Sequence, residues 1–542
     1  MKKLAALASV MVLPAVIVGC SSSSDSGTSG ERTYTEKTAK STGDLDTLKW
    51  GVPGSEPTTL DWIYDWDYGP SNLILSNLCE GLTRQNPDGT TSPNLASKVS
   101  SPDDKTYVYT LQPGVIFTDG KPMIAEDVVF SLHRNLTASP ASYWGLWYQN
   151  VESITATGAD EVTVKLKKPD ALFAEVMSTP AGYVGEQAYI QAKGAAYGTA
   201  AGGVMCTGPF SFASWSKGQN ITLKRNDSYW NPEFKAKAAT VVMNFIPDPS
   251  ALNSALLTGE VDGASGITVT SLNGLRNADN GKLYFNKGTE VVLMQLNDLT
   301  TGPLKDLRIR RALRDVVDYA GITAGVLGGY AQPAKTFAPE ATWGYAPDIF
   351  KDGDADLAGG KQDVDAARKL VEEAGGAPNE PIVIAVNSDD ISIVNAVTTI
   401  QASAKTIGLK VEIRKLPAAE FTDLFFNEEA RKGVNVMVNN VTVDAADPLE
   451  LLIQLIPGSP YDYTGLDDKR FADAATKAAE TTDDQERARL TNAALKIYND
   501  QVYGIPLYSQ DARLFLNNAV TGAPVNSLSQ WYYPWAATVG KS

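Results

Sequence analysis

Residues 101–135 of this chain change from the pattern of a strand to that of a helix within one short stretch. Apolar and polar side chains alternate over residues 106–111, which is the period of a half-buried strand. A tight turn is predicted at Gly120, because glycine adopts positive φ without strain. From Ala125 onward the apolar residues follow a helical period, and acidic residues occupy the first turn, where the helix dipole favours anions. This segment predicts a mixed α and β structure.

The same stretch resembles the signature of the family 5 solute-binding proteins of ABC importers, which include oligopeptide- and dipeptide-binding proteins. The residues at matching positions are Leu111, Gly114, Val115, Phe117, Asp119, Gly120, Ala125, Glu126, Asp127, Val128, Phe130 and Ser131. The family usually has Ser or Thr as the helix N-cap where this chain has Ile124, a loss of about 1 kcal/mol. The resemblance implies an α/β fold of the type II periplasmic-binding-protein kind, with two lobes around a ligand cleft and a small mixed subdomain in the first lobe.

Further segments resemble the family in the same order along the chain: residues 54–61, 77–82, 93–96, 206–210, 224–230, 253–262 and 504–508. The resemblance implies the following division: lobe I at 46–81, 181–295 and 505–542, its small subdomain at 82–180, and lobe II at 296–504. Strands that pass between two lobes form a hinge, which lets the lobes close on a ligand.

The second half of the chain contains a strand–helix–strand pattern at residues 382–386, 391–407 and 409–413. A connection of this length implies a parallel pair of strands with a right-handed crossover. A helix capped by Asp306 is predicted to continue to Ala320, because the apolar residues in this stretch recur with a helical period. Lobe II is therefore expected to be α/β.

Length, charge and histidine content exclude several classes of protein. The chain has 542 residues, too many for one compact core, and a formal net charge of −16, which argues against nucleic acid or an anionic membrane surface as a partner. The single histidine, His133, excludes a multi-histidine metal site, and a Ser-His-Asp triad would have to use it. We interpret His133 as an ordinary helix residue and expect neither a metal nor a cofactor.

The first residues are interpreted as a targeting segment. Two lysines precede an apolar run at residues 4–18, which is too short to span a membrane and is typical of a signal peptide covering residues 1–19. The run ends before Cys20 in a pattern that resembles a bacterial lipobox, which implies cleavage before Cys20 and lipidation of its thiol. An ordinary cysteine in a secretory signal is the alternative. Residues 20–45 are predicted to be a flexible tether that holds the protein at the outer face of the cytoplasmic membrane.

Two further cysteines, Cys79 and Cys206, are expected outside the cytoplasm, where disulfides persist. We predict that they form one disulfide. Two buried free thiols are the alternative.

Residues 444–448 match a pattern in which, by resemblance, the family's peptide binders hold the ligand's amino terminus with an aspartate. A buried ammonium needs a carboxylate, because an unpaired buried charge is costly. We therefore expect Asp444 to bind a ligand ammonium. The alternative is that Asp444 caps a turn before a helix that starts near Pro448. The tryptophan that peptide binders often carry just upstream is absent.

Five other residues are weaker candidates for the ligand site. Glu56 lies in the loop after the first strand, and four aromatic residues lie in loops that resemble those of the family: Trp343, Tyr345, Tyr461 and Tyr463. Aromatic side chains suit a promiscuous pocket because they bury area with few rotatable bonds. Each of them could instead belong to the core. No arginine stands out as a partner for a ligand carboxylate.

The sequence predicts a monomeric, lipid-anchored binding protein that delivers short peptides to an ABC permease. The alternatives are the same fold with a sugar, nickel chelate or other small solute, and a receptor lipoprotein. The chain contains no Walker A, G-x-S-x-G or HExxH motif, so we do not expect an enzyme.

Overall fold

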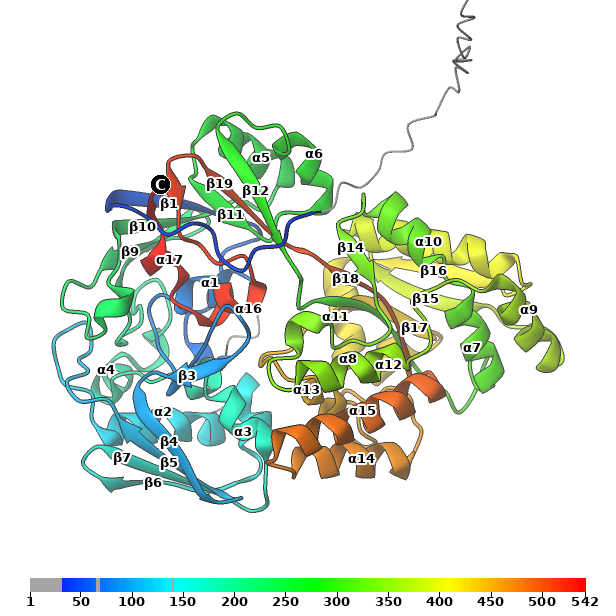
Figure 1. Ribbon diagram of the computed structural model, residues 1–542, viewed down its shortest axis with the longest axis horizontal. Coiled ribbons are helices and arrows are strands. Elements are labelled where there is room, and N and C mark those ends of the chain that lie inside the picture. Colours follow the sequence, from blue (N-terminus) through cyan, green and yellow to red (C-terminus); the bar gives the residue numbers. More distant parts are fainter. Residues whose placement is uncertain (1–31, 65–68, 139–140) are drawn as a thin grey trace, which may run out of the picture. The chain divides into compact units, whose positions relative to one another are not determined.

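The computed structural model describes residues 32–64, 69–138 and 141–542 (Figure 1). The predicted signal peptide and Cys20 lie outside the described residues. Within the described ranges we find no helix with the length and apolar character needed to cross a membrane.

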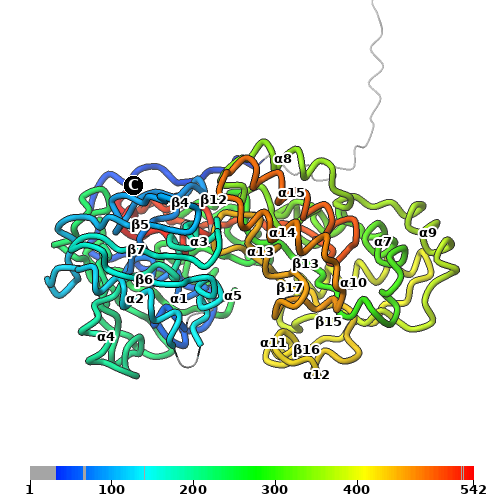
Figure 2. Tube along the Cα trace, turned by 90° about the horizontal axis from the view of Figure 1, so that it is seen from below, coloured from blue at the N-terminus to red at the C-terminus, as the bar shows by residue number. Residues whose placement is uncertain are grey.

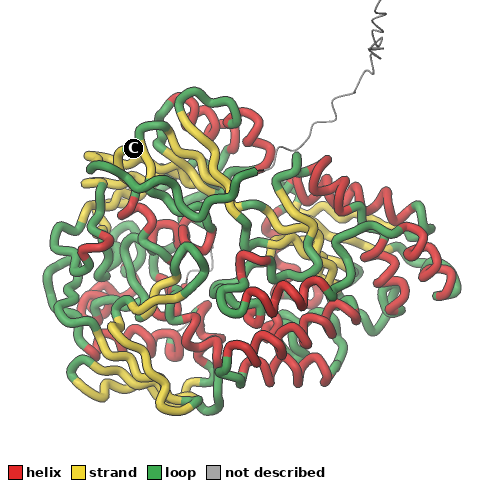
Figure 3. The backbone as a smooth tube through the Cα atoms, viewed as in Figure 1, coloured by secondary structure: helices red, strands yellow, loops and turns green. Residues whose placement is uncertain are grey.

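The first sheet has the strand order β12-β19-β11-β1-β10-β9-β8 and defines lobe I (Figure 3). Its strands are β1 (Leu45–Val52), β8 (Phe210–Ser216), β9 (Asn220–Arg225), β10 (Ala238–Phe245), β11 (Gly263–Ser265), β12 (Gly281–Asn286) and β19 (Ala512–Asn517). β1 runs parallel to both β10 and β11. Trp50 of β1 is fully buried, and its ring lies 4.4 Å from that of Trp535. The buried side chains of β1 therefore form part of the core of lobe I.

The second sheet has the order β14-β18-β13-β17-β15-β16 and defines lobe II. Its strands are β13 (Val291–Leu296), β14 (Ala331–Pro333), β15 (Ile382–Asn387), β16 (Val411–Leu416), β17 (Val436–Val441) and β18 (Gly504–Gln510). β15, α10 (Ile391–Lys405) and β16 form the predicted crossover unit, with β15 and β16 parallel. The expectation of an α/β second lobe is confirmed.

The helix capped by Asp306 is shorter than predicted. α7 (Leu307–Asp315) begins at this cap, where the Asp306 side chain accepts a hydrogen bond from the Arg308 N–H. It ends five residues before Ala320, which is exposed. The buried Val316 and Val317, which suggested a longer helix, lie in the loop that follows.

The small subdomain contains a sheet of order β4-β5-β7-β6 and helix α2 (Ala125–Thr137). Its strands are β4 (Ala96–Asp103), β5 (Thr106–Leu111), β6 (Val151–Gly158) and β7 (Glu161–Leu166). β5 alternates between half-buried and buried residues, as predicted. Ile124 offers no polar cap, but its N–H donates to the Asp127 carboxylate at 3.1 Å, so the helix start keeps one hydrogen bond.

Other helices cover these sheets. They are α1 (Pro70–Leu75), α3 (Ala171–Val176), α4 (Gln187–Lys193), α5 (Pro249–Thr258), α6 (Leu272–Leu275), α8 (Pro347–Ala355), α9 (Val364–Glu373), α11 (Ala418–Phe426), α12 (Glu428–Arg431), α13 (Leu449–Gln454), α14 (Lys469–Ala479), α15 (Asp484–Gln501), α16 (Ser527–Tyr532) and α17 (Trp535–Thr538). α16 and α17 belong to the C-terminal segment and pack with α1 and β10 of lobe I.

The chain crosses between the sheets at two places that are close to the predicted boundaries. The first crossing lies at residues 287–290, between β12 and β13. The return lies at Asp511, between β18 and β19, which Figure 1 shows as one continuous segment. Figure 2 shows the elements of the two lobes on opposite sides in a second view. We therefore place the proposed lobe boundaries at residues 287–290 and at 511, in place of 296 and 504.

Residues 33–43, which were predicted to be part of the flexible tether, are packed against lobe I. Thr38 is buried, and its N–H and hydroxyl both donate to the Ala523 carbonyl. The Gly43 carbonyl accepts from the Lys541 N–H at 2.9 Å. The Ser- and Thr-rich composition suggested a solvated chain, but here hydroxyl and backbone groups pair with the C-terminal segment.

The predicted disulfide is confirmed. Cys79, which follows α1, is bonded to Cys206, which precedes β8. Both residues are buried in the core of lobe I.

Replacing both cysteines, as Cys79→Ala with Cys206→Ala, is expected to lower the free energy of unfolding by about 2–5 kcal/mol. The bond closes a loop with a sequence separation of 127 residues, whose loss of entropy in the unfolded chain favours folding. Urea unfolding followed by tryptophan fluorescence measures the difference, with reduced wild-type protein as the control. Equal midpoints for the variant and the oxidised wild type would contradict the expectation.

Candidate functional site

The candidate site lies where parallel strands of both sheets end. β15 and β17 run parallel in lobe II and are followed by Asp390 and by residues 442–448. In lobe I, β1 and β11 run parallel and are followed by residues 53–61 and by Gly266. Ligands of open α/β sheets bind outside the carboxyl ends of the strands, so this junction is the expected binding region.

Asp444 lies at the junction of the two lobes and is 2% exposed. Its Oδ1 accepts a hydrogen bond from the Tyr532 hydroxyl at 3.0 Å. Tyr532 belongs to α16 of lobe I, whereas Asp444 follows β17 of lobe II. Trp531 and Tyr532 also pack on Val443 and Ala446, which flank Asp444. The residue chosen from sequence therefore joins elements of both lobes.

Glu450 fixes the backbone beneath Asp444. Its carboxylate accepts the Asp444 N–H at 2.8 and 2.9 Å and the Ala445 N–H at 2.7 Å. Burial, followed by the charge of Asp444, raises the pKa of Glu450 well above its ordinary value. Glu450 therefore holds the backbone of residues 444 and 445 in place directly beside the Asp444 carboxyl group.

Asp447, the second aspartate of the predicted pattern, is paired within lobe II. Its Oδ1 accepts from the Tyr345 hydroxyl at 3.0 Å and from the Leu449 N–H at 2.9 Å. Arg487 of α15 places Nε 3.4 Å from the other carboxylate oxygen, and its guanidinium lies 3.9 Å from the centre of the Tyr345 ring. Burial raises the pKa of Asp447, and Arg487 opposes this shift. Asp447 thus anchors the loop that carries Asp444.

The lobes also contact each other around this loop. The Gly344 N–H donates to the Ala446 carbonyl at 3.2 Å, and a Cβ on Gly344 would lie 2.6 Å from the carbonyl oxygen of Gly89 in lobe I. The close approach therefore requires glycine at position 344. Farther along the junction, Lys168 and Glu480 form an ion pair of 3.0 Å.

A groove of about 660 Å³ separates the small subdomain from lobe II beside this ion pair. Its walls combine apolar side chains, among them Trp147, Leu172 and Ile453, with the charged Lys168 and Glu480. A site of this size and mixed lining is typical of small-molecule binding.

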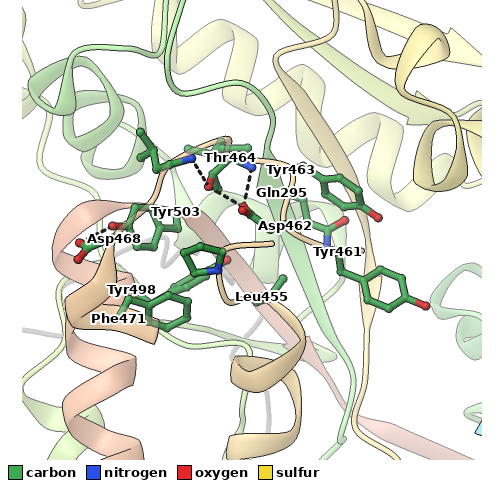
Figure 4. Close-up of a pocket in the computed structure, with 13 residues that line it drawn as sticks. Gln295, Leu455, Tyr461, Asp462, Tyr463, Thr464, Asp468, Phe471, Tyr498 and Tyr503 are labelled. Atoms are coloured by element: carbon green, nitrogen blue, oxygen red, sulfur yellow. Dashed lines mark hydrogen bonds between the residues drawn. The ribbon is translucent and has the colours of Figure 1, made fainter. Parts of the chain in front are cut away.

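The structure brings only some of the predicted residues to Asp444. Tyr345 contacts the loop that carries Asp444, because its hydroxyl donates to Asp447. The pKa of Tyr461 is raised mainly by burial and secondly by the charge of Asp444. Tyr461 and Tyr463 line a pocket of about 20 Å³ within lobe II together with Phe471, Tyr498 and Tyr503. Figure 4 shows the rings of Tyr461 and Tyr463 pointing away from the other three. The Tyr463 hydroxyl donates to the Phe425 carbonyl at 3.3 Å.

Glu56 and Trp343 have contacts elsewhere. The Glu56 carboxylate accepts from Trp215 Nε1 at 2.7 Å and from the Gly218 N–H at 2.9 Å, so it fixes the turn between β8 and β9. The Gly218 bond is the main cause of its lowered pKa. Trp343 Nε1 donates to the Ala338 carbonyl at 3.0 Å. We therefore leave both residues out of the proposed site.

Sequence reasoning missed Tyr532, Glu450 and Arg487. Glu450 lies two residues after the recognised pattern at 444–448, and this position was the one available signal. Tyr532 lies 88 residues after Asp444 in the sequence, and Arg487 also lies far from Asp447 in the sequence, so only the fold brings these pairs together. His133 is half-buried on α2, with Nε2 3.3 Å from the Ile154 carbonyl oxygen. Within the described ranges no cluster of His, Cys, Asp and Glu is placed to hold a metal.

Two α/β lobes joined by two crossing segments form the fold of the type II periplasmic binding proteins. The chain belongs to the bacterial extracellular solute-binding proteins, family 5, whose model matches residues 90–462. The members of this family are extracytoplasmic substrate-binding proteins that take part in transport. The resemblance of the sequence to family 5 is therefore confirmed.

The chain is 26% identical over 446 residues to the probable D,D-dipeptide-binding periplasmic protein DdpA of Escherichia coli, covering 80% of this chain and 82% of that protein. It is also 26% identical over 462 residues to the oligopeptide-binding protein OppA of Bacillus subtilis, covering 81% and 83%. Among solved structures, the ABC transporter substrate-binding protein CtaP of Listeria monocytogenes matches with a TM-score of 0.80 and 21% identity, covering 92% of this chain and 99% of that one. This match supports the fold.

Glu175 of α3 is expected to make stability depend on pH. Its Oε1 lies 4.0 Å from Arg487 Nη2 across the junction. Burial, then the charge of Asp447, raises the pKa of Glu175 to about 7 from 4.5, although Arg487 opposes the shift. The folded protein therefore holds a proton that the unfolded chain releases, so the stabilising contribution is complete below pH 4.5 and is lost as the pH rises through 7.

Glu175→Gln should remove this part of the pH dependence. The free energy of unfolding of the variant is expected to fall less between pH 4.5 and 7 than that of the wild type. Denaturant unfolding across this range is the measurement, and Glu480→Gln, which alters a more exposed carboxylate at the same junction, is the control. Parallel curves for wild type and Glu175→Gln would contradict the assignment.

Proposed function

We propose that this protein captures short peptides as its lobes close and delivers them, chemically unchanged, to the membrane permease of an ABC importer. The single observation that carries the proposal is the position of Asp444. It follows a strand of lobe II, accepts a hydrogen bond from Tyr532 of lobe I, and lies beside Glu450, whose pKa is raised by burial and by the charge of Asp444. A buried carboxylate at the point where the lobes meet is suited to a ligand ammonium.

The names of the two relatives support a peptide as the ligand. One is called D,D-dipeptide-binding and the other oligopeptide-binding. Tyr461, which is only partly buried and whose pKa is affected by the charge of Asp444, supplies an aromatic ring that suits variable side chains.

We further propose that the protein acts as a monomer and is attached to the outer face of the cytoplasmic membrane through lipidated Cys20. The lipobox-like sequence before Cys20 supports the anchor. Residues 33–43 pack on lobe I, so the anchor would be joined to the protein through this lobe.

Asp444→Asn is expected to weaken the binding of peptides with a free amino terminus by at least about 30-fold. Removing one member of a buried charge pair costs about 2 kcal/mol or more. Titration calorimetry with short peptides measures the affinity, and Glu56→Gln is the matched control because that carboxylate is already bonded within lobe I. Amino-terminally acetylated peptides should bind wild type and Asp444→Asn equally weakly.

Equal affinity of wild type and Asp444→Asn for the free peptides would exclude Asp444 as the ammonium partner. Mass spectrometry of small molecules released from the natively purified protein tests the ligand class itself. Recovery of a sugar or chelate, with no heat from peptides, would overturn the proposed function.

A further inference from the structure

One aromatic side chain of lobe II lies in the core of lobe I. Tyr330 directly precedes β14, the edge strand of the lobe II sheet, yet its side chain is 4% exposed. It belongs to a cluster built mainly from α5, α6, β11 and β19 of lobe I, which includes Leu256, Leu275 and Phe515. Among the described members of this cluster, Tyr330 alone comes from lobe II. The lobes are therefore joined here by a side chain, in addition to the two crossings of the chain.

Lobe I holds both the ring and the hydroxyl of Tyr330. The ring stacks on that of Phe285 in β12, with 5.4 Å between the ring centres and 21° between their planes. Arg276, which follows α6, donates to the hydroxyl through Nη2. A buried tyrosine needs a partner for its hydroxyl, and lobe I supplies that partner as well as the apolar surroundings.

The backbone that carries Tyr330 belongs to lobe II. The Tyr330 N–H donates to the Leu327 carbonyl at 2.9 Å, and the Gly329 N–H donates to the Thr323 carbonyl at 2.8 Å. Gly328 and Gly329 have positive φ angles of 57° and 78°, which residues with a side chain rarely adopt. The turn that brings Tyr330 from lobe II into lobe I therefore depends on these two glycines.

The contact lies beside the crossings of the chain. The N–H of Asp511, at the return crossing, donates to the Tyr330 carbonyl at 3.2 Å, and Phe285 ends shortly before the first crossing at 287–290. The Asp511 carboxylate accepts from the Tyr34 hydroxyl at 3.0 Å, and Tyr34 forms a β-bridge with Phe285. Two crossings alone let lobe II bend and twist, whereas a third point of attachment next to them narrows the range of both movements.

Opening and closing of the lobes are limited in different ways. The lobes touch in the described arrangement, because Gly344 approaches the Gly89 carbonyl so closely that a Cβ would lie 2.6 Å away, and Asp444 accepts from Tyr532. Closing much further would make these surfaces collide, whereas opening separates them and meets no such stop. A looser attachment at Tyr330 should therefore shift the average arrangement toward open lobes.

We propose that Tyr330 is a third, non-covalent connection between the lobes, which limits how far they open and keeps the ligand-free protein near its binding-competent arrangement. The inference rests on the closing movement in the proposed function, but not on the identity of the ligand. Apparent affinity falls in proportion to the population of the competent arrangement, so loss of the connection weakens binding although Tyr330 does not touch the ligand.

Small-angle X-ray scattering of the ligand-free full chain tests the connection. Tyr330→Leu, which removes the stacked ring and the hydroxyl, should have a larger radius of gyration than wild type and should bind short peptides at least about threefold more weakly. Tyr319→Leu is the matched control, because Tyr319 is buried within lobe II and its hydroxyl donates to the Arg314 carbonyl at 3.4 Å. This control should lose stability but keep the radius of gyration and peptide affinity of wild type.

A folded Tyr330→Leu protein with the radius of gyration of wild type would overturn the proposal and leave Tyr330 as a core residue of lobe I. An equal increase in Tyr319→Leu would also overturn it, because any loss of packing would then loosen the lobes. If Tyr330→Leu does not fold, Tyr330→Phe decides: it loses only the bond from Arg276, and the absence of a smaller increase overturns the proposal. If peptides do not bind wild type, the proposed function fails, while the ligand-free comparison still decides whether Tyr330 connects the lobes.

Discussion

One continuous segment, from β18 to β19, completes both sheets of the molecule. β18 lies between β14 and β13 in lobe II, and β19 lies between β12 and β11 in lobe I. Lobe II is thus an insertion whose two ends lie side by side, where the Gln510 N–H donates to the Glu290 carbonyl at 3.3 Å. During synthesis, the sheet of lobe I stays incomplete until the ribosome has added residue 517, so both lobes reach their final connection late.

The same topology concentrates buried charge between the lobes. Glu290, Arg513, Asp444 and Asp447 all lie at crossings or strand ends, and Asp444 and Asp447 are almost fully buried. Asp447 is balanced inside lobe II by Arg487 and Tyr345, whereas Asp444 is bonded from lobe I by Tyr532. Charges paired within one lobe keep a loop in place, and those that face the other lobe are available to a ligand.

Local patterns were sufficient to predict much of the fold. The crossover unit at β15, α10 and β16 depends on periodicity within one stretch, and the disulfide followed from a count of cysteines and the expected compartment. The contacts of Asp444 could not be predicted, because Tyr532 lies 88 residues away. The prediction of a flexible tether was wrong for residues 33–43. Their polar groups pair with the C-terminal segment, and composition does not reveal contacts with a distant part of the sequence.

The Cys79–Cys206 bond encloses the entire small subdomain in a covalent loop. A protease that cuts one exposed turn of that subdomain would leave both fragments joined. The nicked molecule would keep its mass on a non-reducing gel and separate into two pieces only after reduction. The subdomain that borders the groove can therefore be opened by a cut while it stays covalently joined to the rest of the protein.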